Sequence, residues 1–259
     1  MIRLVREKPL GTVCGMIILI WILVAIFADA LTPYPPDEIH LRDRLTSSST
    51  QYLLGTDHLG RDLLSRLILG GRLSILIGLS ITALSTVIST LIGGTSGFIG
   101  GKFDIIVQRV VDAWIVFPGL LLLLTIMSIV GPGIPQIILV LGISGGIGGS
   151  RVIRGAVIAI KENDYFLAAE ATGNRRVRTL IRHVVPNIMP VIIIVFSISL
   201  GGHILSLASL SFLGFGLPPG SPDWGSLLSI EGRQYMEQAP WLALWPGLCL
   251  TLVVYSLNM

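Results

Sequence analysis

Charged residues are scarce in this chain of 259 residues. Asp, Glu, Lys and Arg make up 13% of it, whereas a soluble globular protein carries about 25%. Hydrophobic residues make up 52%, and the mean hydropathy is +0.82. The composition therefore excludes an ordinary soluble domain and predicts an integral membrane protein that lies in a lipid bilayer. The net charge of +3 is small and no basic patch is interleaved with aromatic residues, so no nucleic acid partner is expected.

Cysteines and nucleotide-binding motifs are also lacking. Cys14 and Cys249 lie in apolar runs near opposite ends of the chain, which favours two buried thiols over a disulfide framework or a metal site. The stretch nearest to a P-loop, SGFIGGKF, lacks the first glycine and has Phe103 where Ser or Thr must hold magnesium. We therefore expect that the chain binds no cofactor, is not an enzyme, and relies on a partner subunit for any use of ATP.

Acidic residues are rare inside the apolar runs. Asp29, Asp104 and Asp112 lie near the ends of such runs, where a long or polar side chain reaches the interface at little cost. A secondary transporter driven by protons or sodium would carry acids near the middle of its helices. This class therefore stays an alternative with little support.

Six apolar runs are long enough, or nearly so, to cross a bilayer core of about 30 Å. The first resembles a signal peptide because Arg3, Arg6 and Lys8 precede it, but at about 19 residues it is longer than the usual apolar segment, so we expect a retained helix. The six runs cover about residues 10–28, 73–98, 105–130, 134–160, 188–212 and 241–257.

Glycine and proline predict local features of these runs. Gly93 and Gly97 are four residues apart and predict a small-residue face for close helix packing. Pro118 predicts a kink in the third run. The stretch GISGGIGGS in the fourth run is too glycine-rich for us to expect a rigid helix. Residues 61–69 could form a short amphipathic helix before the second run.

Lysine and arginine counts predict the orientation. With the amino terminus inside, the inner segments hold three basic residues before the first run, two between the second and third, and seven in residues 151–182. The outer segments then hold six, five of them in residues 31–72. Because inner loops carry the excess of Lys and Arg, we expect a cytoplasmic amino terminus and a cytoplasmic segment 151–190.

That segment is the longest break in the apolar pattern. A cation costs about 2.5–3.5 kcal/mol at the centre of a membrane helix, so most of residues 151–190 must lie outside the lipid. The helix formers FLAAEA, then Gly173, then Pro186 and Pro190, predict a short helix, a turn and a second, basic helix.

The segment DYFLAAEATG, followed thirteen residues after Gly173 by Pro186, resembles the EAA loop of ABC importer permeases. In that family the loop is a cytoplasmic helix that docks onto a separate ATPase subunit. The glutamate that gives the loop its name would fall on Leu167, and Glu170 is displaced by three positions. The resemblance assigns the ATPase-coupling role to Asp164, Tyr165, Ala168, Ala169, Gly173 and Pro186.

Two further stretches make the resemblance specific. LGTDHLGRDLLSRLILGGRLS (54–74) and SLSFLGFGLPPGSPDWGSLL (209–228) resemble the C-type permease of dipeptide, oligopeptide and nickel transporters. The resemblance implies an all-α integral membrane protein with about six transmembrane helices and the type I ABC importer permease fold. It places an N-terminal helix and external loop in 1–72, and the importer transmembrane domain in 73–259 with its cytoplasmic coupling loop at about 161–187.

The resemblance also implies function and partners. The chain would form half of a translocation path for peptides, nickel or related small solutes in the inner or plasma membrane. Its partners would be a homologous second permease subunit, two cytoplasmic ATPase subunits and an extracytoplasmic solute-binding protein. Such permeases usually continue into a short charged tail, so we expect the sequence to be truncated after its last apolar run.

A rival interpretation concerns Ser144. It lies in GISGG, which matches the nucleophile motif G-x-S-x-G. In a six-span protein this motif is similar to that of rhomboid-like intramembrane serine proteases, and His203 would then be the candidate general base. The glycine-rich stretch makes a chance match easy, and the last apolar run contains no histidine. We therefore interpret Ser144 and His203 as residues of a translocation path, or His203 as a satisfied core residue.

Overall fold

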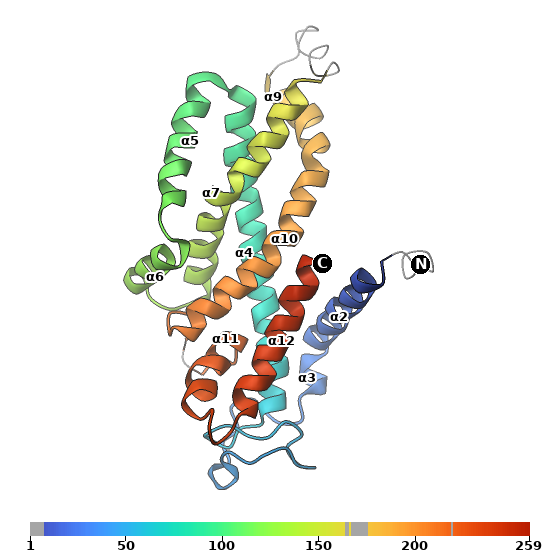
Figure 1. Cartoon of the computed structure of the whole chain (residues 1–259), viewed down its shortest axis with the longest axis vertical. Helices are drawn as coiled ribbons and strands as arrows, with labels where there is room; N and C mark the ends of the chain where they lie inside the picture. The colour runs from blue at the N-terminus through green and yellow to red at the C-terminus, as the bar shows by residue number, and fades with distance from the viewer. Residues whose placement is uncertain (1–7, 164–165, 167–175, 219) are drawn as a thin grey trace. The chain divides into compact units, whose positions relative to one another are not determined.

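The computed structural model describes residues 8–163, 166, 176–218 and 220–259, which form helices and connecting loops without a β-strand among them (Figure 1). The helices are α2 (Pro9–Ile26), α3 (Ala28–Leu31), α4 (Leu63–Ile99), α5 (Gly101–Val116), α6 (Gly119–Val130), α7 (Ile134–Lys161), α9 (Arg176–Thr179), α10 (Val185–Phe212), α11 (Trp224–Ser226) and α12 (Trp241–Asn258). Short turns of other helix types are η1 (Leu41–Asp43), η2 (Leu180–Val184) and η3 (Leu227–Gly232).

The expected membrane spans are present in the part of the chain that the structure describes. Five helices there are long and apolar enough to cross a membrane, namely α2, α4, α7, α10 and α12. The pair α5 and α6 makes a sixth if it is counted as one span, and it is bent by 89°. The bend lies at Phe117, which is extended at φ −71° and ψ 135°, as expected for a residue before proline. The kink predicted at Pro118 is thus confirmed.

Helix α4 begins earlier than the apolar run suggested. The Asp62 carboxylate accepts hydrogen bonds from the backbone N–H of Ser65 at 2.8 Å and from the Ser65 hydroxyl at 2.7 Å, which caps the first turn. The predicted short helix at residues 61–69 is therefore the first part of α4 and not a separate element.

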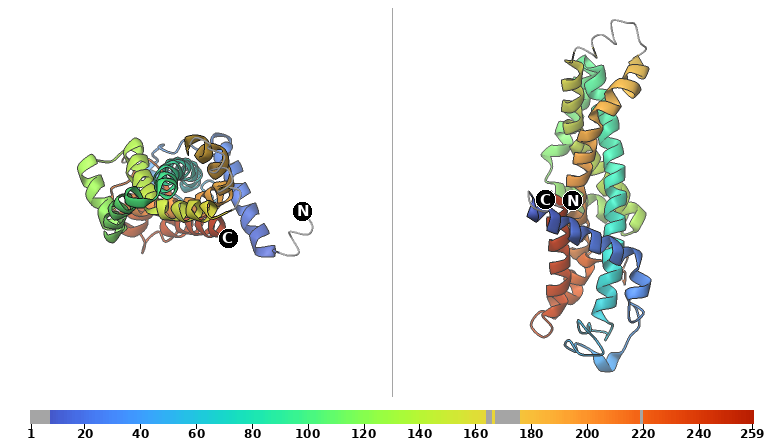
Figure 2. Two further views of the ribbon diagram at one scale, coloured as in Figure 1. Left: turned by 90° about the horizontal axis from the view of Figure 1, so that it is seen from above. Right: turned by 90° about the vertical axis from the view of Figure 1, so that its right-hand side faces the viewer.

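The chain divides into two compact units. Unit 1 contains the residues up to Leu79, Met127–Ile137 and the residues from Leu200 onward. Its core surrounds the fully buried Trp224, with Leu67, Ile204 and Val253 among the residues packed there. Within this unit α12 packs against α2 and η3 (Figure 2).

Unit 2 contains Ser80–Ile126 and Ile138–Ser199. Here α4 and α7 approach so closely that a Cβ atom on Gly93 would lie 2.2 Å from the carbonyl oxygen of Ser150. A Cβ atom on Gly97 would lie 3.0 Å from the carbonyl oxygen of Arg154. The predicted small-residue face is thus confirmed. The glycine-rich stretch of α7 is a continuous helix. Gly146 in it also allows close approach to α4, since a Cβ atom there would lie 2.6 Å from Ile88.

Candidate functional site

The predicted coupling segment is bounded in unit 2 by the end of α7 and by η2 and the start of α10. Pro186, the second residue of α10, is exposed there, and α10 follows the π-helical turn η2 without a break. Five of the six residues assigned to coupling, and Leu167 with them, lie outside the residues that the structure describes: Asp164, Tyr165, Ala168, Ala169 and Gly173.

Phe166 anchors this segment to unit 2. Its side chain is 2% exposed, and its ring meets that of Phe98 edge-on, with centroids 6.3 Å apart and an interplanar angle of 87°. Its buried neighbours come from both bounding helices and η2: Ile153, Val157, Val184 and Ile188. The sequence analysis missed this role. The available signal was the apolar pair Phe166 and Leu167, which lies in the sequence between the polar stretch that ends at Tyr165 and two alanines.

A carboxylate and a guanidinium join α5 to α7 close to the same end. Arg154 donates from Nε to Asp104 Oδ1 at 2.6 Å and from Nη2 to Asp104 Oδ2 at 2.5 Å, a bidentate arrangement. The Ser96 hydroxyl of α4 also donates to Asp104, and Gln108 Nε2 donates to Ser96 Oγ at 3.1 Å. Asp104 of α5 is therefore held by side chains of α4 and α7 rather than extended to an interface.

Lys161 fastens the end of α7 to the end of α4. Its Nζ donates to the carbonyl oxygens of Phe98 at 2.9 Å and Gly97 at 3.3 Å. The last carbonyls of a helix have no partner inside it and carry the negative end of its dipole, so a lysine there is favourable. Lys161 is the last residue of α7, so this contact lies next to the start of the predicted coupling segment.

A second ion pair between α5 and α7 is more open to solvent. Arg151 pairs with Asp112, and the two side chains are 47% and 38% exposed. Arg109 lies 3.7 Å from the same carboxylate and is 80% exposed. Exposed pairs of this kind contribute about 0–1 kcal/mol. Arg151 is thus a natural comparison for Arg154.

Among the residues that the structure describes, the hydrogen-bond partner of Ser144 is not a base. The half-buried Ser144 hydroxyl accepts a hydrogen bond from Trp114 Nε1 at 3.4 Å, and an indole N–H donates only, so it cannot act as a base. His203 lies in the part of α10 that belongs to unit 1 and is half-buried. The structure describes the two residues in different units.

In unit 1 the motifs at 54–74 and 209–228 meet around Trp224. This side chain is fully buried and donates from Nε1 to the carbonyl oxygen of Leu67 at 3.1 Å, while its backbone N–H donates to Ser74 Oγ at 3.4 Å. A Cβ atom on Gly70 would lie 2.1 Å from the carbonyl oxygen of Pro222. Asp223 caps α11 by accepting from two backbone N–H groups, and burial raises the pKa of its carboxyl.

Asp57 is the centre of a second buried arrangement in unit 1. It is fully buried and accepts from the backbone N–H of Leu59 at 2.8 Å and of Arg61 at 2.9 Å. Arg61 Nε donates to the same carboxylate at 2.5 Å, and Arg66 Nε lies 3.6 Å from it. A buried carboxylate with this many donors holds the whole turn in one conformation.

A cavity of about 530 Å³ lies beside this arrangement. His58 lines it and stacks on Tyr235, with ring centroids 5.5 Å apart and an angle of 11°. Burial lowers the pKa of His58, and Arg61, Arg66 and Arg44 act in the same direction, while Asp57 opposes them. The other polar side chains that line the cavity are Arg61, Arg66, Ser211, Ser221, Ser226 and Ser229.

Comparison with known protein families identifies the family of this chain. Residues 89–259 match the family described as binding-protein-dependent transport system inner membrane component. Residues 1–51 match the N-terminal TM domain of oligopeptide transport permease C. The chain belongs to this permease family. The family resemblance predicted from the sequence is thus confirmed, and the permease is a multi-span inner-membrane protein of a transporter complex.

Several curated permeases are similar over nearly the whole chain. A dipeptide transport system permease protein of Alkalihalophilus pseudofirmus is 34% identical, over 98% of this chain and 83% of the relative. A di/tripeptide permease of Pseudomonas aeruginosa is 36% identical, over 96% and 84%. A glutathione transport system permease of Pectobacterium atrosepticum is 33% identical, over 99% and 85%.

A solved structure shares the fold. A chain of the MetNI methionine ABC transporter, in an inward-facing conformation, matches with a TM-score of 0.57 and 20% sequence identity. The match covers 73% of the permease and 91% of that chain. The predicted all-α, type I importer permease fold is thereby confirmed, and the serine protease and secondary transporter are not favoured.

Proposed function

We propose that this permease forms half of the translocation path of an ATP-driven importer for small peptides or related small solutes, nickel included. The observation that carries the substrate class is the set of relatives named for dipeptide, di/tripeptide and glutathione transport. A homologous second permease completes the path, two cytoplasmic ATPase subunits use the ATP, and an extracytoplasmic binding protein delivers the solute.

The proposed orientation follows the distribution of basic residues. Residues 161–187 form the coupling loop on the cytoplasmic side, and the amino terminus lies on that side too. The arrangement around Asp57 and Trp224 then faces outside, and the cavity of about 530 Å³ beside it is proposed as part of the entrance that receives the solute. Its polar lining of arginine, histidine and serine suits the peptide groups and termini of such a solute.

Coupling is proposed to run through the contacts at the two ends of the loop. An ATPase that moves the loop would pull on Phe166 within its buried cluster and on Lys161 at the end of α4. Asp104 and Arg154 would pass that movement to α5, while the glycine contacts let α4 and α7 slide. In this proposal Ser144 lies along the path, and His203 lies in the path or the core.

Docking of the loop is proposed to use a stripe of small residues. On a helix, residues three and four apart share a face, so Tyr165, Ala168, Ala169 and Thr172 would form one stripe. The two alanines would let an ATPase groove approach the backbone. Leu167 would point away from this stripe and pack against the permease itself.

Labelling of single cysteines tests the orientation. In a variant with Cys14 and Cys249 replaced by alanine, a cysteine at position 174 should react with an impermeant maleimide only from the cytoplasmic side. A cysteine at position 58 should react from outside. Labelling of position 174 in intact cells, without opening of the membrane, would overturn the proposal.

Bulk on the proposed docking stripe tests the coupling. Ala168→Trp and Gly173→Val should each lower transport and transport-stimulated ATP hydrolysis in the assembled complex, while insertion and yield stay normal. Leu167→Glu is the matched control because Leu167 precedes Ala168 in the sequence but lies off the stripe, and it should be tolerated. Normal transport by the Ala168→Trp, Gly173→Val double variant would show that the loop is only a linker.

A further inference from the structure

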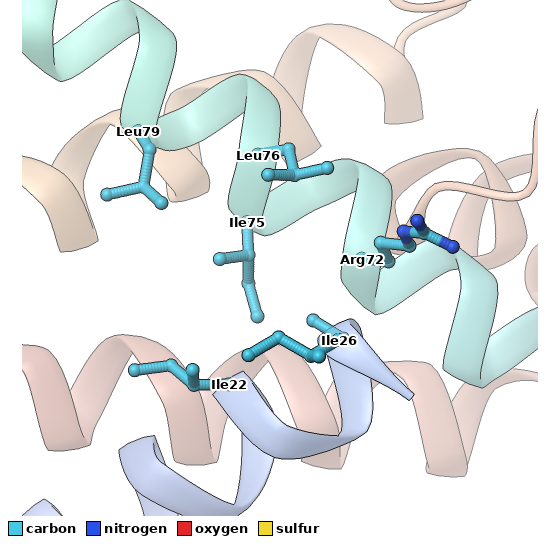
Figure 3. Close-up of a pocket in the computed structure, with 7 residues that line it drawn as sticks. Ile22, Ile26, Arg72, Ile75, Leu76 and Leu79 are labelled. Carbon is cyan, nitrogen blue, oxygen red and sulfur yellow. The ribbon is translucent and has the colours of Figure 1, made fainter. Parts of the chain in front are cut away.

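An apolar groove of about 340 Å³ lies in unit 1 between α2 and the first part of α4 (Figure 3). In Figure 3, Ile75 points from α4 towards Ile22 and Ile26 of α2. The groove is open, since Ile26 is 61% and Leu76 is 52% exposed. Ala25 and Leu79 complete its apolar lining, and Arg72 is its one charged lining residue.

The groove extends along α2 over a length close to the thickness of one lipid leaflet. A second cavity of about 70 Å³ shares Ile22, Ile75 and Leu79 with it and reaches Ile18. Ile26 and Ile18 are eight residues apart, or about 12 Å at 1.5 Å per helical residue. Half of a hydrocarbon core of about 30 Å is about 15 Å. A single acyl chain lying along α2 would therefore fill the groove from the leaflet surface towards the midplane.

A cation and an anion stand together at the end of the groove where α2 stops. Arg72 Nη1 donates to Asp29 Oδ2 at 2.9 Å, and Asp29 belongs to α3, directly after α2. The Arg72 side chain is 37% exposed and the Asp29 side chain is 79% exposed, so both charges are open to a ligand. The pair lies where a lipid headgroup would lie if the acyl chain followed the groove.

We propose that this groove is a binding site for a phospholipid with a primary-amine, zwitterionic headgroup, as in phosphatidylethanolamine. The lipid phosphate would accept hydrogen bonds from the Arg72 guanidinium, which suits oxyanions in its planar, multi-donor geometry. The ammonium group would donate to Asp29, and one acyl chain would lie along Ile26, Ile22 and Ile18.

Charge and hydrogen bonding distinguish this lipid from two common alternatives. Phosphatidylglycerol carries a phosphate but no cationic group. The Asp29 carboxylate would therefore lie near a lipid anion without a lipid cation to pair with. Phosphatidylcholine carries a quaternary ammonium that has no N–H to donate to Asp29. The site is independent of the solute and the ATPase proposed above, because none of its residues belongs to the coupling loop or the polar cavity.

Competition between lipids tests the site. The permease, purified with whatever subunits accompany it, is exchanged into nanodiscs that contain equal amounts of phosphatidylethanolamine, phosphatidylglycerol and phosphatidylcholine. Retained lipid is then identified by native mass spectrometry. Phosphatidylethanolamine should be retained about tenfold over each of the others, since one charge-assisted hydrogen bond corresponds to about a decade in affinity.

Four variants assign that selectivity to the groove. Asp29→Asn should remove the preference for phosphatidylethanolamine over phosphatidylglycerol, and Arg72→Ala should lower retention of all three lipids, with Arg72→Lys retaining part of it. Leu76→Trp should block binding of the acyl chain and so lower retention of all three lipids, whatever their headgroup. Arg109→Ala is the matched control, because Arg109 is also an exposed arginine near an aspartate, and it should change nothing.

Three outcomes would overturn the proposal. The first is equal retention of the three lipids, and the second is a preference that the Asp29→Asn and Leu76→Trp variants both keep. The third is attachment of a photo-crosslinker at position 76 to another protein subunit instead of to lipid, which would make the groove a subunit interface. Thermal unfolding of each variant in detergent separates loss of the site from loss of the fold.

Discussion

The two units hold their central carboxylates in different ways. In unit 1, Asp57 lies in irregular chain, is fully buried and accepts from two backbone N–H groups as well as from Arg61 Nε. In unit 2, Asp104 lies on α5 and binds Arg154 of α7, the helix that meets α4 through glycine. Backbone-directed contacts hold one shape, whereas helices in contact through glycine can shift past one another. The difference matches the proposed roles of entrance and coupling.

Removal of the indole from unit 1 should have the largest effect. Trp224→Ala leaves a cavity in a fully buried site, and such changes cost about 3–5 kcal/mol. We expect loss of folded protein, measured by thermal unfolding in detergent. Trp224→Phe keeps most of the volume and loses only the hydrogen bond to Leu67, so it should cost about 1 kcal/mol. Equal effects of the two variants would show that packing around Trp224 is unimportant.

Loss of Arg154 from its ion pair with Asp104 in unit 2 should have the second-largest effect on stability. Arg154→Ala leaves Asp104 beside apolar helices without its guanidinium, and we expect a loss of about 2–3 kcal/mol, below the range for fully buried pairs because Arg154 is 32% exposed. The double variant Asp104→Asn, Arg154→Gln should recover part of it. Arg151→Ala is the control, since it removes an exposed arginine from the same helix, and it should change stability by less than about 1 kcal/mol.

A methyl group tests the glycine contact of unit 2. Gly93→Ala should destabilise this unit by about 1–3 kcal/mol, because the added carbon meets the Ser150 carbonyl. Gly94→Ala adds the same carbon where nothing lies within 4 Å, and it should stabilise the helix by about 0.5–1 kcal/mol. Thermal unfolding of both variants measures the difference. An increase in stability for both variants would mean that α4 and α7 are not in close contact at Gly93.

The smallest expected effect is a pH dependence of unit 1. Because burial lowers the pKa of His58 in the folded state, the unfolded state takes up a proton first as the pH falls. Stability should therefore be highest above about pH 6.5, the ordinary pKa of histidine, and should decrease as the pH falls below it. His58→Phe keeps a ring against Tyr235 and should flatten this dependence between pH 7.5 and 5. If stability depends on pH in the same way in His58→Phe as in the parent, other titratable groups cause that dependence.

Local features of the helices could be predicted from the sequence. The spans, the break at Pro118 and the glycine face at Gly93 and Gly97 were all predicted, because apolar runs, proline and four-residue spacing act within one helix. The burial of Phe166 was not predicted, since its neighbours come from elements on both sides of the coupling segment.

The polar contacts of the two units were missed for the same reason. Asp104 and Arg154 are 50 positions apart in the sequence, and Trp224 and the Leu67 carbonyl are 157 positions apart. The local pattern around each residue does not indicate which distant residue it will meet. Such pairings follow from the packing of the folded helices, so the structure was needed to recognise them.

ATP-driven movement is proposed to enter unit 2 through the contacts at the ends of the coupling loop. The most direct test measures solute transported per ATP hydrolysed, in proteoliposomes that contain the complete complex. Lys161→Gln removes the cation from the α4 carbonyls, and Lys102→Gln is its control, an exposed lysine on α5. We predict that Lys161→Gln lowers transport per ATP severalfold while the Lys102→Gln ratio stays at the parent value. An unchanged ratio in a folded Lys161→Gln complex would contradict this route of coupling.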